Sequence, residues 1–336
     1  MSYAVWGWGD LAEQPTAADL EAVGPLVTAS TGIAVQPPEH ETAAPDLAPP
    51  VRALPAALAH LGSAHPVDRQ RHGIGRSYRD LIRGLRGQVT DVPDLVVRPG
   101  TEQDVVDVLD WAGAVGAPVI PFGGGSSVVG GVEPRGLTRA ISLDLSRLAG
   151  VVEVDAGSRA VRLRAGTFGP AAEAELKPHG LTLRFYPQSF ERSTVGGWLA
   201  TRAAGHFSTG PTHIDDLVES LRALTPTGSW ESRRLPGSGA GPSPDRMLLG
   251  SEGTLGVITE LTLRLLPAQP PQATVVASFP TVDSAGAAVL AITGQLRPSM
   301  LEFMDAVAIN AVVPSLLSSC GWPGPVTLRP PGVAGH

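Results

Sequence analysis

The sequence predicts an α+β fold, and three observations support this class. A β-α-β pattern runs over residues 95–121, strand patterns without regular helical alternation follow over residues 140–165, and a further β-α pattern begins after Pro267. Alternating strands and helices favour parallel pairing, whereas strands joined by short turns favour antiparallel pairing. A mixture of both patterns predicts α+β rather than a regular parallel sheet.

Composition narrows the class of function. The chain has 336 residues, of which 43% are hydrophobic, so it can build two or three domains with sizeable cores. A formal net charge of −7 without a long basic run argues against binding to nucleic acid or to an anionic membrane surface. The single cysteine, Cys320, excludes an intrachain disulfide and a zinc site built on cysteine pairs. Small-molecule chemistry is the better expectation.

The chain shows no targeting or membrane signal. The N-terminal residues lack a basic region followed by an apolar core, and no stretch approaches the ~20 apolar residues of a membrane span. We therefore expect a cytoplasmic protein without a transmembrane segment.

Residues 1–88 are expected to form an N-terminal lead-in region. Proline-rich pieces at residues 36–38 and 48–50 argue against long regular elements before residue 60. The stretch His72–Tyr78 predicts a turn that opens a short helix. A folding unit is expected to begin at residue 89.

Residues 89–268 carry most of the regular patterns. Strands are predicted at Leu95–Val97 and Pro118–Pro121, with Thr101–Asp104 as the N-terminal turn of the helix between them. The later expectations are hairpin-like strands at Ala140–Leu145, Val151–Val154 and Ala160–Ala165, a helix over Phe168–His179 that stops at Gly180, and a strand at Ser220–Leu224 followed by a turn at Thr225–Gly228.

Composition changes after Pro267, and residues 269–336 are expected to begin a second domain. A strand is predicted at Thr274–Ser278, a helix at Val282–Gln295, and the start of another strand and helix at Leu301–Ala311. Gly321–His336 is dominated by proline and glycine, which predicts a frayed tail.

A glycine-rich loop follows the second predicted strand directly. Pro121–Val128 reads Pro-Phe-Gly-Gly-Gly-Ser-Ser-Val, and consecutive glycines let the backbone pass where a Cβ would clash and let amides converge on a phosphate. Two further clusters, Ser193–Gly197 and Gly253–Gly256, also join glycine to hydroxyl groups. Three such loops suit one elongated phosphate-bearing ligand, although tight structural turns explain each loop equally well. None matches the usual NAD or ATP fingerprints.

Single charged residues leave alternatives open. Glu252 is a candidate ligand contact, but it equally fits a strand-end carboxylate satisfied by backbone amides. Arg202 could pair with a diphosphate, although an isolated arginine is more often salt-bridged. The histidines show no metal-ligand spacing, so we expect no metal site. No Gly-x-Ser-x-Gly elbow and no cysteine beside a histidine supports covalent hydrolysis.

Taken together and in order, the loops resemble the FAD-binding domain of the vanillyl-alcohol-oxidase/PCMH superfamily of FAD-linked oxidases, and most closely its alkyldihydroxyacetonephosphate synthase branch. That branch typically carries Pro-Ile-Gly-Gly-Gly-Thr-Ser-Val, Ser-Thr-Val-Gly-Gly-Trp with Thr-Arg-Ala-Ser-Gly, and Gly-Ser-Glu-Gly-Thr-Leu-Gly-Val-Ile-Thr-Glu. Here Pro121–Val128 carries two substitutions and Thr201–Gly205 one, while Ser193–Trp198 and Gly250–Glu260 agree throughout. The similarity covers roughly residues 68–310.

The resemblance implies a PCMH-type FAD-binding domain of two subdomains, followed by the beginning of an α/β cap domain, with FAD as cofactor. It implies that the first loop wraps the diphosphate, that residues 188–194 and 201–204 border the flavin and ribityl region, and that residues 252–258 close over the cofactor. The implied cofactor contacts are Pro121, Phe122, Gly123, Gly124, Gly125, Ser126, Ser127, Gln188, Ser189, Ser193, Thr194, Thr201, Arg202, Ala203, Ala204, Glu252, Gly253, Thr254, Leu255, Gly256, Val257 and Ile258.

Some positions depart from the branch. Its Pro-Asp-Ser becomes Pro187-Gln188-Ser189, and its Tyr-Gly becomes Pro211-Thr212. An amide in place of an acceptor-only carboxylate alters hydrogen bonding near the cofactor. The branch resembles a non-covalent binder, so we expect no covalent tether at His72.

The resemblance implies a flavoenzyme of ether-lipid synthesis that exchanges acyl for alkyl on dihydroxyacetone phosphate, acting on a small-molecule or lipid-like substrate. Two alternatives stay open: an FAD-dependent dehydrogenase of 2-hydroxy acids such as D-lactate or glycolate, and an inactive flavin-binding fragment. Nothing here matches the family's catalytic tyrosine segment, so no catalytic residue is named. We expect either a truncated or frameshifted product or a partner that completes the site. A homodimer is a separate possibility.

Overall fold

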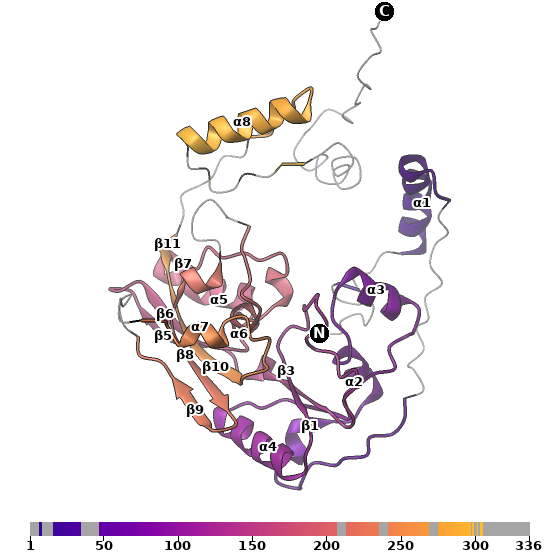
Figure 1. Cartoon of the computed structure of the whole chain (residues 1–336), viewed down its shortest axis with the longest axis vertical. Coiled ribbons are helices and arrows are strands. Elements are labelled where there is room, and N and C mark those ends of the chain that lie inside the picture. Colours follow the sequence, from indigo (N-terminus) through magenta and orange to yellow (C-terminus); the bar gives the residue numbers. More distant parts are fainter. Residues whose placement is uncertain are drawn as a thin grey trace, which may run out of the picture. The chain divides into compact units, whose positions relative to one another are not determined.

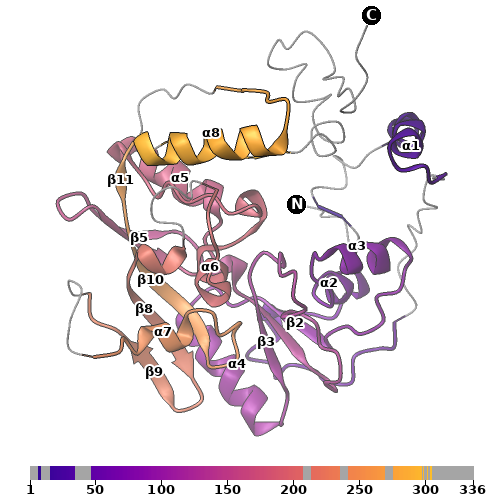
Figure 2. The same cartoon turned by 45° about the horizontal axis from the view of Figure 1, so that its top comes forward.

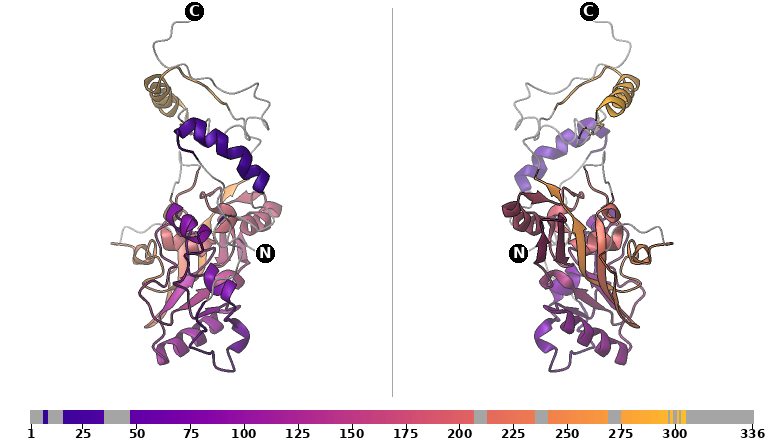
Figure 3. Two further views of the ribbon diagram at one scale, coloured as in Figure 1. Left: turned by 90° about the vertical axis from the view of Figure 1, so that its right-hand side faces the viewer. Right: turned by 90° about the vertical axis from the view of Figure 1, so that its left-hand side faces the viewer.

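The chain was analysed as a computed structural model that describes residues 7–8, 16–34, 47–206, 213–234, 241–268, 275–296, 298, 301 and 303–304. Two compact units are present, one within residues 1–14 and 40–272 and the other within 15–39 and 273–336. The first unit holds both large sheets (Figure 1) and can be followed from further directions in Figures 2 and 3.

A mixed four-stranded sheet forms the first half of the larger unit. Its strands, in spatial order, are β1 (Gly62–Ser63), β2 (Leu95–Val97), β4 (Ile141–Asp144) and β3 (Val119–Phe122). Both β2 and β3 run parallel to β4, whereas β1 pairs antiparallel with β2. The glycine-rich loop therefore leaves the sheet at the carboxyl end of an edge strand, a position where parallel sheets commonly bind ligands.

Helix α4 (Glu102–Ala114) connects β2 to β3. Thr101 and Asp104 form a capping box at its first turn, as the sequence predicts. Its buried residues Val105 and Val108 share one hydrophobic cluster with Leu224 and Val257, which belong to the second sheet. This helix therefore packs the two sheets into one unit.

The second sheet is antiparallel and has five strands. In spatial order they are β5 (Val151–Asp155), β6 (Ala160–Arg164), β10 (Val257–Arg264), β8 (Val218–Thr225) and β9 (Gly228–Glu231). Helices α5 (Gly169–Leu176) and α6 (Val195–Thr201) contribute Leu176, Trp198 and Leu199 to the same buried cluster as Leu261 of β10. Burying such large side chains is the dominant stabilising term in a core of this kind.

Shorter elements complete the larger unit. They are α2 (Pro66–Arg71), α3 (Tyr78–Leu85), α7 (Asp245–Leu248), a pair of antiparallel strands β7 (Leu181–Thr182) and β11 (Leu266–Pro267), and 3-10 helices at Ala59–Leu61, Leu145–Arg147, Lys177–His179, Phe190–Arg192 and Ile214–Asp216. The fold is thus α+β, as expected.

One expected pairing is wrong. Ala140–Leu145 was predicted as a hairpin-like strand beside Val151–Val154, but β4 lies in the first sheet between β2 and β3. All four residues of β4 are buried, because it has a neighbouring strand on each side. The strands expected at Val151–Val154 and Ala160–Ala165 are present as β5 and β6, which pair antiparallel with each other.

A second expectation also fails, since a long helix does form before residue 60. Helix α1 (Ala17–Thr31) begins at Thr16, whose hydroxyl accepts from the Asp19 amide, and ends at Gly32 with φ +71°. Pro25 lies inside it. A capping box and a left-handed C-terminal glycine are helix boundary signals that outweigh the general proline content of the region.

The second unit contains α1 and α8 (Val282–Gln295), the latter with the predicted bounds. The described part of the predicted strand at Thr274–Ser278, residues 275–278, is not a strand. The predictions at Leu301–Ala311 and Gly321–His336 lie outside the described residues, apart from residues 301, 303 and 304. The boundaries 1–88, 89–268 and 269–336 stay predictions.

A buried ionic network fixes α2 against the first sheet. Asp144, at the end of β4, accepts from His72 Nε2 at 3.1 Å, from Arg98 Nε at 3.0 Å and from the Ser146 amide at 3.0 Å. Burial raises the pKa of the Asp144 carboxyl, but the hydrogen bond and charge of His72 and the Ser146 amide outweigh burial and hold that pKa below its usual range. The His72 ring also packs on Phe122, with ring centroids 4.1 Å apart.

Replacing Asp144 by Asn should therefore lower the free energy of unfolding by about 3 kcal/mol, because a buried partner charge is left uncompensated. The lowered pKa means that the contribution of Asp144 is complete above pH about 3.9 and is lost as pH falls further. Urea titrations at about pH 6 should show the full difference between wild type and variant, and titrations below pH about 3.9 a smaller one.

Glu153→Gln is the matched control, because Glu153 faces Arg162 at 3.5 Å on the surface, with 60% of its side chain exposed. Its effect on unfolding should be much smaller. If Asp144→Asn and Glu153→Gln lower the free energy of unfolding equally, the network has no special structural role.

Candidate functional site

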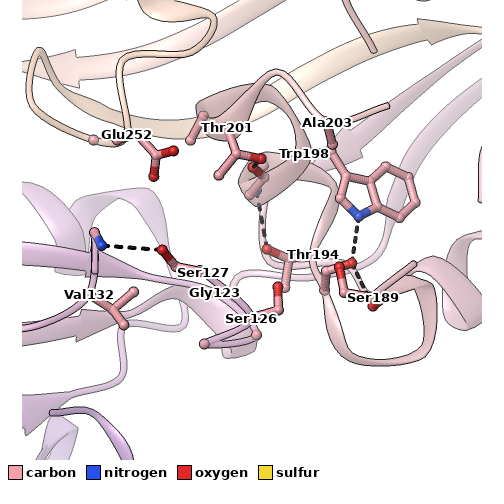
Figure 4. Close-up of a pocket in the computed structure, with 18 of the residues that line it drawn as sticks. Gly123, Ser126, Ser127, Val132, Ser189, Thr194, Trp198, Thr201, Ala203 and Glu252 are labelled. Carbon is pink, nitrogen blue, oxygen red and sulfur yellow. Dashed lines mark hydrogen bonds between the residues drawn. The ribbon is translucent and has the colours of Figure 1, made fainter. Parts of the chain in front are cut away.

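A pocket of ≈780 Å³ opens in the larger unit, a volume typical of ligand sites, which span about 300–1,000 Å³. Its walls come from the loop after β3, the segment that leads into α6, the C-terminal end of α6 and the turn before β10 (Figure 4). Both sheets therefore contribute to one cavity.

The glycine-rich loop lies directly against the backbone that precedes α6. A Cβ added at Gly124 would overlap the carbonyl oxygen of Arg192 and would come within 2.9 Å of Ser193 Cα. Because backbone atoms cannot rotate away as a side chain can, only glycine permits this approach. The contact gives the pocket a wall without side chains.

The second half of the loop is held by hydrogen bonds. Ser127 Oγ accepts from the Gly131 amide at 3.2 Å, and the Ser127 carbonyl accepts from the Arg76 amide at 2.7 Å. Figure 4 shows the first of these bonds at the edge of the pocket. The loop is thereby tied both to itself and to the segment that precedes α3.

The facing wall is a chain of hydroxyl hydrogen bonds. Trp198 Nε1 donates to Ser193 Oγ at 2.7 Å, and this hydroxyl donates to the Ser189 carbonyl at 2.8 Å. Thr194 caps α6, with its Oγ1 accepting from the Gly197 amide at 3.3 Å. Trp198 is only 1% exposed, so these bonds anchor residues 189–194 to the core (Figure 4).

Arg202 lies at the C-terminal end of α6 with φ +49° and lines the pocket. Its guanidinium donates to Asp215 Oδ2 at 2.8 Å, and Arg246 binds the same oxygen. Burial raises the pKa of Asp215, but the two arginines outweigh burial and lower it. The salt-bridged alternative for Arg202 is thus present, at a position that also borders the cavity.

Glu252 carries its carboxylate on the pocket wall. Its backbone has φ +53°, and its amide donates to the Ala200 carbonyl at 2.9 Å. Burial raises the pKa of this carboxyl. Gly131 faces it so closely that an added Cβ would lie 2.8 Å from Oε2. Figure 4 shows the carboxylate on the side of the cavity that carries Ser127 and Thr201.

The structure brings the predicted contacts together with three exceptions. All of them line the pocket except Thr254, Leu255 and Val257. Thr254 closes the turn by donating from Oγ1 to the Ser251 carbonyl at 2.6 Å, Leu255 is 46% exposed, and Val257 is buried in the cluster around α4. These three support the turn that presents their neighbours.

Several lining residues are not among the individually implied contacts, although Val128, Gly196 and Gly197 lie in the loops predicted to line the ligand. They are Trp8, Val128, Val129, Gly131, Val132, Leu145, Ala165, Gly196, Gly197, Trp198 and Ala200. Most of these residues lie next to one of the three glycine clusters in the sequence, so extending each cluster by a few residues would have included them. Trp8, Leu145 and Ala165 are far from the glycine clusters in sequence and enter only through tertiary packing.

Other sites were sought in the described part of the chain. It contains no group of three or more His, Cys, Asp or Glu side chains able to hold a metal ion. His72 is absent from the pocket lining, and its two ring nitrogens lie 2.7 Å from the Asp68 carbonyl and 3.1 Å from Asp144. Over the same described ranges, no helix is long and apolar enough to cross a membrane.

The residues present fit a dinucleotide. Gly123, Gly124 and Gly125 line the cavity without side chains, and Ser126, Ser127, Thr194 and Thr201 bring hydroxyl groups to it. Backbone amides in glycine-rich turns are suited to phosphate oxygens, and hydroxyl groups serve as either donor or acceptor.

Comparison with known proteins agrees with this geometry. Residues 93–232 match the FAD binding domain family, and residues 268–319 match the C-terminal domain of FAD linked oxidases. Alkyldihydroxyacetonephosphate synthase of Dictyostelium discoideum is 39% identical over 241 residues, which cover 70% of this chain and 39% of that protein. A mitochondrial cytochrome-type D-lactate dehydrogenase of Arabidopsis thaliana is 31% identical over 230 residues, covering 67% and 40%.

A solved structure of an alkyldihydroxyacetonephosphate synthase superposes with a TM-score of 0.68 and 36% identity, covering 76% of this chain and 49% of that one. The chain thus spans less than half the length of these relatives. The two family matches, the shared fold and the glycine-lined pocket agree, and the chain belongs to the FAD-linked oxidases of the PCMH/vanillyl-alcohol-oxidase type, with FAD as its cofactor.

Proposed function

We propose that the pocket between the two sheets is the FAD site. Residues 121–127 hold the diphosphate, residues 188–194 and 201–204 border the flavin and ribityl region, and the turn at 252–258 closes over the cofactor. The single observation that carries this proposal is the contact of Gly124 with the Arg192 carbonyl, because it packs the glycine-rich loop against the backbone before α6 with no side chain between them.

The charges of the pocket support an orientation in which the FAD diphosphate lies at the glycine-rich loop and away from Glu252. Phosphate oxygens are best placed at the glycine-rich loop, where backbone amides supply partial positive charge. The carboxylate of Glu252 repels phosphate, and as an acceptor it suits the hydroxyl or N–H groups of the ligand instead. The bound FAD supplies redox-active ring chemistry, whereas the residues described here bind it, orient it and shape its cavity.

The proposed reaction is that of the synthase branch, the exchange of an acyl for an alkyl group on dihydroxyacetone phosphate in ether-lipid synthesis. Support comes from the higher identity to the Dictyostelium synthase, 39%, than to the Arabidopsis dehydrogenase, 31%, over stretches of similar length. Identity of Gly250–Glu260 with the pattern typical of that branch adds to it.

A dehydrogenase of 2-hydroxy acids is the second candidate. The match to the D-lactate dehydrogenase covers 67% of this chain, so the glycine loops alone do not separate the two reactions. A flavin-binding chain without turnover is the third outcome of the tests below.

The FAD site is tested by substituting Gly124 with Ala. The added Cβ forces the loop away from Arg192, and we expect the dissociation constant for FAD to rise by about a hundredfold, which corresponds to about 2.7 kcal/mol. Titration of the apoprotein followed by flavin fluorescence measures the constant, with circular dichroism as a check on folding.

Gly113→Ala is the matched control, since nothing lies within 4 Å of an added Cβ at this position of α4. It should bind FAD as the wild type does. Should both alanine variants bind FAD with wild-type affinity, the loop is not the diphosphate site.

The reaction is tested with FAD-loaded protein, an acyl dihydroxyacetone phosphate and a radiolabelled fatty alcohol. We expect label in an ether product, because the proposed exchange joins the alcohol oxygen and its chain to the dihydroxyacetone carbon, while the bond from that carbon to the acyl oxygen breaks and the acyl chain leaves as the fatty acid with the alcohol proton. D-lactate or glycolate, added anaerobically, should leave the absorbance of the flavin unchanged.

Bleaching by a hydroxy acid without ether product would favour the second candidate over the first. Full flavin content with neither response would reject both reactions and leave FAD binding alone.

A further inference from the structure

Trp8 is the most distant contributor to the pocket in sequence. The other lining residues begin at Pro121, more than a hundred positions later. Trp8 is 41% exposed, whereas Gly7 beside it is buried. A large indole surface from the N-terminal region therefore faces the cavity that the glycine loops form.

The other aromatic side chains of the lining are buried in the core. Phe122 is 9% exposed and packs on His72, and Trp198 is 1% exposed and packs on Phe185, with ring centroids 5.3 Å apart. Within the described lining, Trp8 alone offers an aromatic ring with substantial accessible surface.

The surroundings of Trp8 in the lining are small or aliphatic. Glycine, alanine, serine and threonine predominate, and the exposed larger apolar side chains besides Trp8 are Val128 at 59% and Val129 at 71%. Accessible apolar surface within a pocket is typical of a ligand-contact surface. FAD carries two planar aromatic ring systems that suit such a surface.

We propose that Trp8 is a stacking residue for one of the planar rings of FAD, so that the N-terminal region contributes directly to the cofactor site. This rests on the proposed FAD site and adds a contact outside the glycine loops. Indole rings stack on aromatic rings in offset or edge-on arrangements, and the uncharged indole does not repel the diphosphate.

The test compares Trp8→Ala with Trp8→Phe by titrating each apoprotein with FAD. Trp8→Ala should raise the dissociation constant by about tenfold, which corresponds to about 1.4 kcal/mol, and Trp8→Phe should restore most of that loss because it keeps an aromatic face. Trp230→Ala is the matched control, since Trp230 is 36% exposed on β9 and does not line the pocket. It should bind FAD as the wild type does.

Titration with FMN and ADP, which are fragments of FAD, identifies which ring of the cofactor Trp8 stacks on. If Trp8 stacks on the flavin, Trp8→Ala weakens binding of FMN and not of ADP; if it stacks on adenine, the reverse holds. Either pattern supports the proposal. Unchanged binding of FAD, FMN and ADP by Trp8→Ala overturns it.

This failure is distinguishable from failure of the FAD site itself. Wild-type protein that binds FAD in a Gly124-dependent way, together with a Trp8→Ala variant of equal affinity, rejects the stacking role alone. Absence of FAD binding by the wild type rejects both.

Discussion

The candidate site depends on one close approach, that of the backbone at Gly124 to the backbone at Arg192 and Ser193. The first segment leaves the mixed four-stranded sheet and the second leads into α6, which packs on the antiparallel sheet. Their contact closes one side of the cavity and fixes how far apart its walls stand. Because no side chain intervenes, the geometry is set by backbone atoms, which sequence variation outside these glycines cannot displace easily.

Two other features hold these two backbone segments in place. Helix α4 joins the sheets through a shared hydrophobic cluster, and Glu102 at its start binds Arg222 of β8 at 2.9 Å. On either side of the glycine loop, Phe122 packs on His72 within the Asp144 network, and Ser193 is tied to Trp198. The pocket is thus supported from both cores, which is what a site needs in order to hold a ligand in one orientation.

Much of the fold and of the site could be predicted because the signals are local. The capping box at Thr101, the bounds of α8 and the three glycine clusters are readable within windows of a few residues. Strand partners are not local, so the sequence pattern indicates a hairpin for β4, whereas its four buried residues lie between two parallel neighbours in a mixed sheet. Trp8 was missed for the same reason, since only tertiary packing brings it to the cavity. Helix α1 was not predicted, because the proline content of residues 1–60 argues against a long helix, whereas the capping residues at its two ends favour one.

Hydrogen exchange measured on the protein with and without FAD shows whether FAD lies across both sheets at the Gly124 contact. FAD bound there should slow amide exchange at residues 123–127, 193–197 and 252–256, three segments from different parts of the fold, with little change in β9. Binding of FAD that leaves exchange at these three segments unaltered would contradict this location of the cofactor.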